Sequence, residues 1–171
     1  MEVLSMLKFE ELKSIETHID SLSELLVKVV DGGASIGFLP PMKLSDARKY
    51  WQTVLKPDTI LFIAKINNEI VGTIQLHLCT KQNGLHRAEI AKLMTGPYAR
   101  RKGVARSLMK IAEEKAIIEG RTLLVLDTRE GDPSNFLYQS LGYIQAGKIP
   151  NFALSGKGDL DTTVLYYKIL N

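Results

Sequence analysis

The stretch from His86 to Gly120, HRAEIAKLMTGPYARRKGVARSLMKIAEEKAIIEG, decides how the rest of the chain is arranged. It begins with a β-prone run, Ala88 to Thr95, which breaks at Gly96-Pro97. A basic turn follows, and apolar residues then recur at the spacing of one helix face. These residues are Val104, Leu108, Ile111, Ala112 and the aliphatic stem of Lys115. The stretch therefore predicts a strand, a basic turn, and a helix that Gly120 ends in a left-handed conformation.

The basic turn is suited to binding an anion. A helix start has unpaired N–H groups and a partial positive charge, so it can hold a phosphate. Gly103 lets the backbone approach closely, and Ala105 keeps that approach open. Four basic residues surround this point: Arg100, Arg101, Lys102 and Arg106. The turn contains neither GxxxxGK[ST] nor a three-glycine dinucleotide fingerprint. A solvated basic turn before an ordinary amphipathic helix is the alternative.

Two ordered motifs resemble those of the GCN5-related N-acetyltransferases (GNAT superfamily). Arg100-x-x-Gly103-x-Ala105, preceded by Leu93-Met94-Thr95-Gly96-Pro97, resembles the acetyl-CoA signature of that family, which more often has glycine in place of Ala105. The likeness continues through Asp127 to Tyr138-Gln-Ser-Leu-Gly142-Tyr143. More narrowly, Gly32-Gly33-Ala-Ser-Ile-Gly-Phe38 followed by Trp51 resembles the small-molecule acetyltransferases of the tabtoxin-resistance type.

This resemblance implies the fold and the cofactor. The fold would be α/β (α+β mixed), with a mostly antiparallel mixed sheet of about six or seven strands and helices on both faces. Acetyl-CoA would be the donor and coenzyme A the product. The strand backbone of Leu93, Met94 and Thr95 would hold the pantetheine arm, and Ser134 and Asn135 would add hydrogen bonds. The pyrophosphate would lie on Arg100, Arg101, Lys102, Gly103, Val104, Ala105 and Arg106.

Glu89 and Tyr138 are the catalytic candidates. Glu89 is the only carboxylate of its predicted strand, and regular alternation would place it on one face with Ala91, Leu93 and Thr95. In the family a glutamate at this spacing often acts as general base, directly or through water, and Tyr138 occupies the general-acid position. The alternatives are a solvated Glu89 paired with Arg87 or Lys92, and a Tyr138 that packs the short helix onto the sheet.

The acceptor is expected to be the amine of a small molecule. The apolar loop of residues 34–41 and the helix after it would wall the acceptor pocket with Ser35, Phe38 and Trp51. A helical hairpin with only a packing role is the alternative for this segment. The rival functions are a protein acetyltransferase, acting on lysine or an N-terminus, and a non-catalytic CoA-binding sensor. The presence of both Glu89 and Tyr138 argues against the sensor.

Composition limits the remaining classes. The 171 residues fit a single N-acetyltransferase domain, residues 1–171, with 45% hydrophobic and 24% charged residues. A net charge of +3 without a long basic run argues against nucleic acid as partner. The single cysteine, Cys79, allows no internal disulfide, and three scattered histidines form no zinc motif, so no metal is expected. We see no membrane-spanning segment or signal peptide and expect a cytoplasmic monomer or homodimer.

Local patterns predict the other elements. A first strand is expected between Val3 and Ile15, and a helix capped by Asp20 or Ser21 and ended by Gly32-Gly33. A second helix should begin at Ser45-Asp46. Two strands, 60–66 and 70–78, should form a hairpin through Asn67-Asn68-Glu69. The apolar run 122–127 predicts a strand buried on both faces. Asp132 should cap a short helix that ends at Gly142, and two closing strands should span 143–149 and 163–169.

Overall fold

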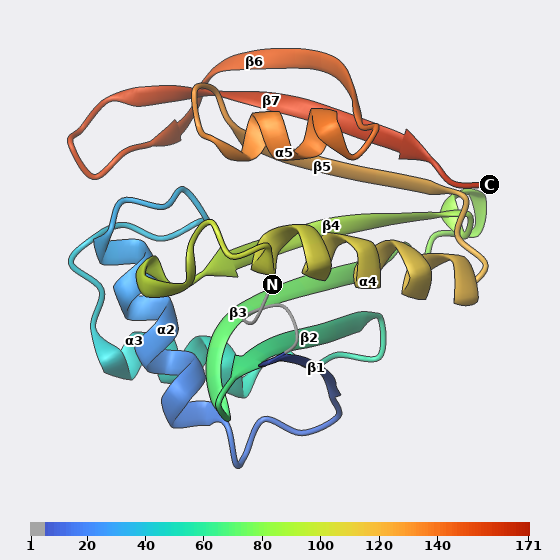
Figure 1. Cartoon of the computed structure of the whole chain (residues 1–171). Coiled ribbons are helices and arrows are strands. Elements are labelled where there is room, and N and C mark those ends of the chain that lie inside the picture. The colour runs from blue at the N-terminus through green and yellow to red at the C-terminus, as the bar shows by residue number, and fades with distance from the viewer. Residues whose placement is uncertain (1–5) are drawn as a thin grey trace.

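One seven-stranded mixed sheet organises the structure, a computed structural model that describes residues 6–171 (Figure 1). The strands are β1 (Leu7–Leu12), β2 (Thr59–Ile66), β3 (Glu69–Leu78), β4 (Arg87–Thr95), β5 (Leu123–Arg129), β6 (Ile144–Leu154) and β7 (Leu160–Ile169). Their order is β1-β2-β3-β4-β5-β7-β6, and every neighbouring pair is antiparallel except β4 and β5. The predicted fold class is confirmed.

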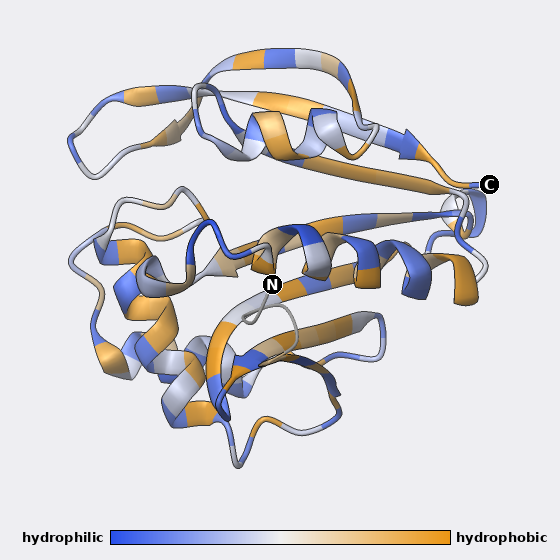
Figure 2. Cartoon of the chain, in the orientation of Figure 1, coloured by the Kyte–Doolittle hydropathy of each residue, from blue (hydrophilic) through white to orange (hydrophobic). Residues whose placement is uncertain are grey.

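Helices cover the two faces of the sheet in pairs. They are α2 (Ile19–Asp31), α3 (Leu44–Gln52), α4 (Val104–Ile118) and α5 (Ser134–Ser140), with short 3₁₀ turns η1 (Gln82–Gly84) and η2 (Pro97–Ala99). One core includes α4 and α5 residues, such as Leu108 and Tyr138. The other core packs α2 and α3 against strands β1 to β4 through residues such as Leu26 and Trp51. In Figure 2 helix α4 has both orange and blue bands, and its buried residues include Val104, Leu108 and Ala112, as the apolar spacing predicts.

The turns at three predicted boundaries are as expected. Asn67 and Asn68 connect β2 to β3 with positive φ values of 51° and 65°, which is the backbone of a type I′ hairpin turn. Gly120 follows the end of α4 and Gly142 follows the end of α5, with φ values of 73° and 88°. Asparagine and glycine tolerate this left-handed conformation, so the local sequence alone determines these three turns.

Strand β4 contains a β-bulge, which regular alternation does not predict. The β3–β4 register shifts between Thr73 and Gln75, and Lys92 has a φ of +53°. The extra residue reverses the facing of the strand: Ile90 and Leu93 both contact the α4-side core, whereas Met94 joins the α2–α3 core. The prediction that Glu89 shares a face with Leu93 and Thr95 is therefore wrong, because a bulge adds one residue to the pleat.

Strands β4 and β5 separate soon after they meet. They pair only through Arg87 with Leu123, Ala88 with Leu124, and Glu89 with Val125. Beyond this point the two strands diverge, as Figure 1 shows. The apolar run of residues 122–127 predicts a strand that is buried on both faces. This prediction is wrong, because one side of β5 faces the gap that opens between the two strands. Its buried residues alternate, and Asp127 is exposed.

The start of α2 has no side-chain cap. The helix begins at Ile19, ahead of the predicted caps Asp20 and Ser21. Asp20 instead forms an ion pair with Arg48 on α3. A tertiary partner has therefore replaced the expected local one, although the first-turn carboxylate still lies at the positive end of the helix dipole. The helix ends at Gly32-Gly33 as predicted.

Helices α3 and α5 also begin differently from the prediction. Helix α3 starts at Leu44, one residue before Ser45-Asp46, and has no side-chain cap. At α5 the Asp132 carboxylate does not cap the helix but accepts a hydrogen bond from Nε of Arg129 at 2.9 Å. The closing strands β6 and β7 are longer than predicted, because their pairing continues to Leu154 and Leu160. The first strand lies inside its predicted window, of which residues 3–5 fall outside the described part of the chain.

Candidate active site

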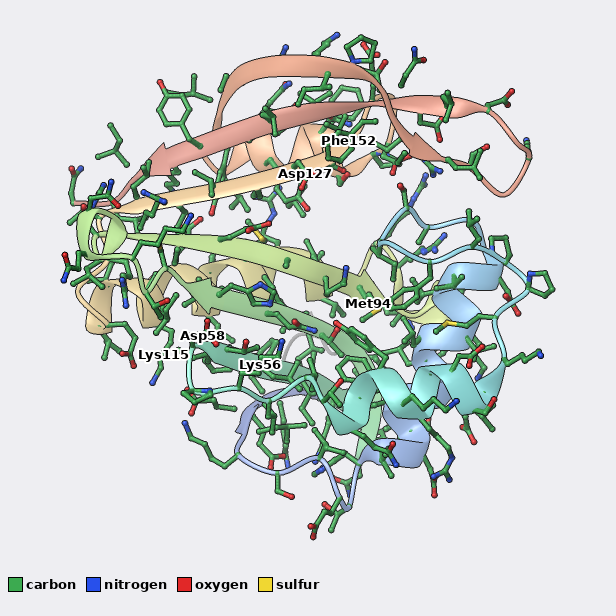
Figure 3. The ribbon with its side chains drawn as sticks, turned by 180° about the vertical axis from the view of Figure 1, so that it is seen from behind. Lys56, Asp58, Met94, Lys115, Asp127 and Phe152 are labelled. Atoms are coloured by element: carbon green, nitrogen blue, oxygen red, sulfur yellow. The ribbon has the colours of Figure 1, made fainter. Side chains whose placement is uncertain are left out.

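The divergence of β4 and β5 opens a cleft of about 680 Å³. Residues 89–95 of β4 form one wall, and residues 127–129 of β5 with 161–163 of β7 form the other. Residues 32–37, which follow α2, and residues 132–134, which precede α5, complete the lining. In Figure 3, Asp127 and Phe152 lie on the β5–β7 side and Met94 lies on the β4 side. Glu89, Tyr138 and the strand segment 93–95 thus share one cavity.

The start of α4 has the features of an anion site. Gly103 adopts the left-handed conformation with a φ of 78°, and no side chain caps the helix. Arg100 and Ala105 line the cleft beside it. The first-turn N–H groups therefore remain available to a ligand. Arg101 and Lys102 are exposed in the same turn and are not among the residues that line the cleft.

The side chains of two residues predicted to bind phosphate are used within the protein. Val104, the first residue of α4, has its side chain buried in the core, so only its backbone could contact a phosphate. The guanidinium of Arg106 donates to Oγ of Ser140 at 2.8 Å and links α4 to α5.

The segment Leu93, Met94 and Thr95, predicted to hold the pantetheine arm, lines the cleft. Strand β4 pairs with β5 only up to Glu89, so the β5-facing edge of this segment has no partner strand among the described residues. An extended, peptide-like group could pair with that edge by main-chain hydrogen bonds.

Glu89 lies at the point where β4 and β5 part. Its residue is exposed, and it forms no ion pair with Arg87 or Lys92 in the described structure. Its cross-strand neighbour is His77 on β3, whose Nε2 lies 2.8 Å from Oε1 of Gln75. The structure therefore does not contain the alternative ion pair of Glu89 with Arg87 or Lys92. The carboxylate faces the cleft instead.

Tyr138 is buried within an aromatic cluster on α5. Its ring centroid lies 5.9 Å from those of both Tyr143 and Tyr166, so its packing role is present. Tyr138 also lines the cleft. Burial raises the pKa of its hydroxyl, and the negative charges of Asp127 and Asp132 raise it further. The hydroxyl therefore keeps its proton at neutral pH.

Ser134 and Asn135 differ in what they offer a ligand. Ser134 lines the cleft, and its Oγ is 2.7 Å from Oγ1 of Thr128. Asn135 is engaged within the protein, because its amide donates to the Arg129 carbonyl at 3.0 Å and its oxygen accepts from the Tyr166 hydroxyl at 2.8 Å. The structure therefore places Ser134, but not Asn135, at the cleft.

The predicted acceptor residues are only partly brought together. Ser35 lines the cleft, whereas Phe38 lies behind it, with its ring centroid 5.7 Å from Nζ of Lys92. Trp51 is fully buried, and its Nε1 donates to the carbonyl of Leu22 at 3.0 Å. Trp51 therefore supports the α2–α3 core and does not wall the pocket.

Several charged residues of the cleft are absent from the predicted site. Asp127, Arg129 and Asp161 line the wall formed by β5, β7 and the segment between them, and Lys92 lines the opposite wall at the bulge. Asp127 could have been found, because a polar residue at the carboxyl end of a buried strand often faces a ligand. The position of Lys92 depends on the bulge, and the local sequence does not reveal it.

Comparison with known proteins identifies the family. A model of the acetyltransferase (GNAT) family matches residues 26–143. The chain belongs to this family. It is also 31% identical over 126 residues to an uncharacterized N-acetyltransferase from the hisH-hisA intergenic region of Azospirillum brasilense, a match that covers 72% of this chain and 74% of that protein.

Solved structures have the same GNAT fold. Ribosomal-protein-alanine N-acetyltransferase of Brucella melitensis superposes with a TM-score of 0.81 at 16% identity, covering 95% of this chain and 99% of its own. The yncA protein of Salmonella typhimurium, solved with its cofactor acetyl-CoA, superposes with a TM-score of 0.80 at 13% identity, covering 97% and 95%. At these identities the likeness concerns the fold alone.

This GNAT protein is an acetyltransferase, and its donor is acetyl-CoA. The cleft fits that donor by its own features: a helix start at Gly103 without a side-chain cap, basic residues around it, and a strand edge that no strand of the described part of the chain pairs with. Residues 6–171 contain no group of three or more His, Cys, Asp or Glu side chains that could hold a metal ion. None of their helices has the length and apolarity needed to cross a membrane.

Proposed function

We propose that this GNAT protein acetylates the amine of a small molecule, with Glu89 as general base and Tyr138 as general acid. The observation that supports this most is the shared cleft: Glu89, Tyr138 and the strand segment 93–95 all line it. Acetyl-CoA, when bound, supplies the acetyl group as a thioester. Segment 93–95 would pair with its arm, and the α4 start with Arg100 would hold its phosphates.

Glu89 and Tyr138 would divide the proton transfers between them. Most amines are protonated at neutral pH, so Glu89 takes one proton before the nitrogen attacks the acetyl carbon. As the nitrogen–carbon bond forms and the carbon–sulfur bond breaks, Tyr138 donates its hydroxyl proton to the sulfur. The second proton of the nitrogen restores the Tyr138 hydroxyl. In sum one proton reaches solvent through Glu89 and one ends on the thiol.

The loop of residues 32–37 favours a small molecule over a protein acceptor. It lines one end of the cleft, which we call the acceptor end, and two hydrogen bonds hold it there. Nη2 of Arg129 donates to the Gly33 carbonyl at 3.0 Å, and Nζ of Lys92 donates to the Ile36 carbonyl at 2.7 Å. A loop held at two points narrows the space that a polypeptide acceptor would need.

Glu89→Gln tests the proposal, because glutamine keeps the size of the side chain and removes its basicity. Acceptors would come from a panel of primary amines, with coenzyme A release followed by thiol detection. For the best acceptor, we expect turnover near neutral pH to fall by roughly 10²- to 10⁴-fold, with part of the rate returning at high pH where the amine is already free. Acetyl-CoA affinity should barely change.

Glu69→Gln is the matched control, because it makes the same change at an exposed glutamate of β3 away from the cleft. It should keep the turnover of the wild type. A Glu89→Gln protein with the rate and acidic limb of the wild type would remove Glu89 from the mechanism. No coenzyme A release with any amine, from a protein that binds acetyl-CoA, would contradict the proposed function itself.

A further inference from the structure

Lys92 is held at the acceptor end of the cleft by the β4 bulge. With a φ of +53°, it occupies the extra position between Ile90 and Leu93, which both contact the α4-side core. Its side chain is therefore directed to the opposite face of the sheet. There Nζ donates to the Ile36 carbonyl at 2.7 Å and lies over the Phe38 ring. One amine is thus fixed beside the loop that closes the pocket.

Asp127 projects into the same cleft from the other wall. Its neighbour Leu126 and the preceding Leu124 are buried in the α4-side core, so alternation directs Asp127 to the opposite face, where Lys92 also lies. Asp127 is exposed, and its Oδ2 accepts a hydrogen bond from Oγ1 of Thr163 at 2.8 Å. Figure 3 shows the side chain on the cleft side of β5.

The charges of Lys92 and Asp127 face the cleft without neutralising each other. No ion pair joins them within the described residues, although both line the same cavity. They are nevertheless close enough to interact. Burial lowers the pKa of Lys92, and Asp127, followed by Glu89, is the main charge opposing that shift.

The other charged side chains of this wall are already paired. Arg129 donates to Asp132 at 2.9 Å, lies 3.7 Å from Asp161, and donates to the Gly33 carbonyl. Lys92, Asp127 and Glu89 are therefore the charges of the acceptor end that form no ion pair in residues 6–171.

We propose that the acceptor is an amino acid, whose carboxylate binds Lys92 and whose ammonium binds Asp127 beside the base Glu89. This inference rests on the proposed function and names its substrate class. A molecule with both a carboxylate and an ammonium can bind Lys92 and Asp127 at the same time. Hydrogen bonds between charged groups are stronger than those between neutral groups. A plain amine leaves the half-buried Lys92 without an anion and places a second cation near it, which disfavours binding.

The test compares each amino acid with its own amide and its decarboxylated amine. The panel contains α-, β- and γ-amino acids, because the separation of the two charges determines which spacing fits. We expect kcat/KM for the best amino acid to exceed those of its two analogues by at least about tenfold, equivalent to about 1.4 kcal/mol. Lys92→Met should remove that preference: loss of the loop contact to Ile36 lowers kcat/KM for all acceptors, and loss of the charge lowers it further for the amino acid alone. Lys92→Arg, which keeps the charge, should retain the preference.

Two controls separate this role from effects on folding. Lys49→Met removes an exposed lysine from α3 and should leave the preference unchanged. Asp127→Asn should lower kcat/KM for amino acids and analogues alike, since all carry the amine. Thermal unfolding of each variant establishes that it is folded.

Calorimetric binding of the amino acid to the CoA-bound protein distinguishes a failed inference from a failed function. Binding that Lys92→Met abolishes would support the carboxylate site even if no acetyl group were transferred. Equal rates for amino acids and their analogues in the wild type would overturn the inference while leaving the acetyltransferase function intact. An equal fold loss of both activities in a folded Lys92→Met protein would also overturn it, because Lys92 would then only position the loop.

Discussion

Glu89 faces the cleft, and neither of its basic neighbours on β4 forms an ion pair with it in the described structure. The bulge directs Lys92 to the carbonyl of Ile36. The guanidinium of Arg87, the first residue of β4, packs against Gly84 of η1. A strand carboxylate with two basic neighbours in sequence thus remains without an ion pair in the described structure. At this scale the catalytic proposal depends on which side chains are left unpaired.

Tyr138→Phe separates the packing role of this side chain from its proposed acid role. The ring and its contacts to Tyr143 and Tyr166 are kept, so the melting temperature should change little. Loss of the proton donor should reduce turnover by roughly 10²-fold or more, measured as coenzyme A release. A Tyr138→Phe enzyme as fast as the wild type would leave Tyr138 with packing alone.

His77 should make folding stability depend on pH. Burial lowers its folded-state pKa below the ordinary 6.5, and Lys92 and Lys56 act in the same direction, while Glu89 and Asp58 oppose it. The unfolded chain therefore binds the proton more readily. The stabilisation is complete above the unfolded pKa and is lost as the pH falls through the folded pKa.

His77→Gln removes this titration and keeps a side-chain amide beside Gln75. Between about pH 7.5 and about pH 5, the melting temperature should fall less for His77→Gln than for the wild type. The carboxylates of the protein contribute equally to both. Parallel pH curves would mean that His77 titrates alike in the folded and unfolded states.

Among the elements, those defined by local chemistry could be predicted from the sequence. The Asn67-Asn68 turn and the glycine ends of α4 and α5 follow from residues that tolerate positive φ. Helix α4 also follows from its spacing, and its buried residues include Val104, Leu108 and Ala112.

The elements that were mispredicted depend on contacts distant in sequence. Asp20 has the chemistry of a cap, yet it pairs with an arginine on another helix. Asp132 is the exception, because its partner Arg129 lies only three residues before it. The β4 bulge arises from the register against β3, which no single stretch of sequence specifies. For the same reason the sequence does not reveal Lys92 as a residue of the cleft, and it wrongly predicts Trp51 there.

Gly103→Glu tests the helix start as the phosphate site. A side chain at a φ of 78° is strained, and its carboxylate would repel a pyrophosphate at the α4 N-terminus. Acetyl-CoA binding should weaken by well over tenfold, or more than about 1.4 kcal/mol, in calorimetry. Gly103→Ala carries the same backbone strain without the charge, so the difference between the two variants isolates the electrostatic part. Wild-type affinity in a folded Gly103→Glu protein would disprove this assignment.

At the scale of the whole molecule, the strand ladder between the two parts of the sheet is short, because β4 and β5 pair only from Arg87 to Glu89. Arg129 connects the two walls of the cleft at the acceptor end, where β4 and β5 are no longer paired. From β5 it donates to the Asp132 carboxylate and to the Gly33 carbonyl, which belongs to the loop after α2. The loop that closes the acceptor end is therefore tied to the opposite wall of the cleft.

Arg129→Met should loosen this loop without disturbing the phosphate site. We expect faster amide hydrogen exchange in residues 33–37 and a roughly tenfold lower kcat/KM for the acceptor, because each lost hydrogen bond to a charged group contributes about 1.5–3 kcal/mol to holding the loop. Acetyl-CoA affinity should stay within about twofold. Arg48→Met, which breaks the surface pair with Asp20 away from the cleft, is the control. Unchanged loop exchange would mean that other contacts hold residues 33–37.

The short β4–β5 ladder also bears on the order in which two substrates arrive. Beyond Glu89 and Val125 the two strands no longer pair, and an extended chain can pair with the β4 edge that is left without a strand among residues 6–171. A thioester arm lying there would act as an additional strand and make the sheet continuous. It would also form the floor on which the acceptor rests. An acceptor that entered first would find that floor missing, so the geometry favours sequential addition with the donor first and coenzyme A as the last product to leave.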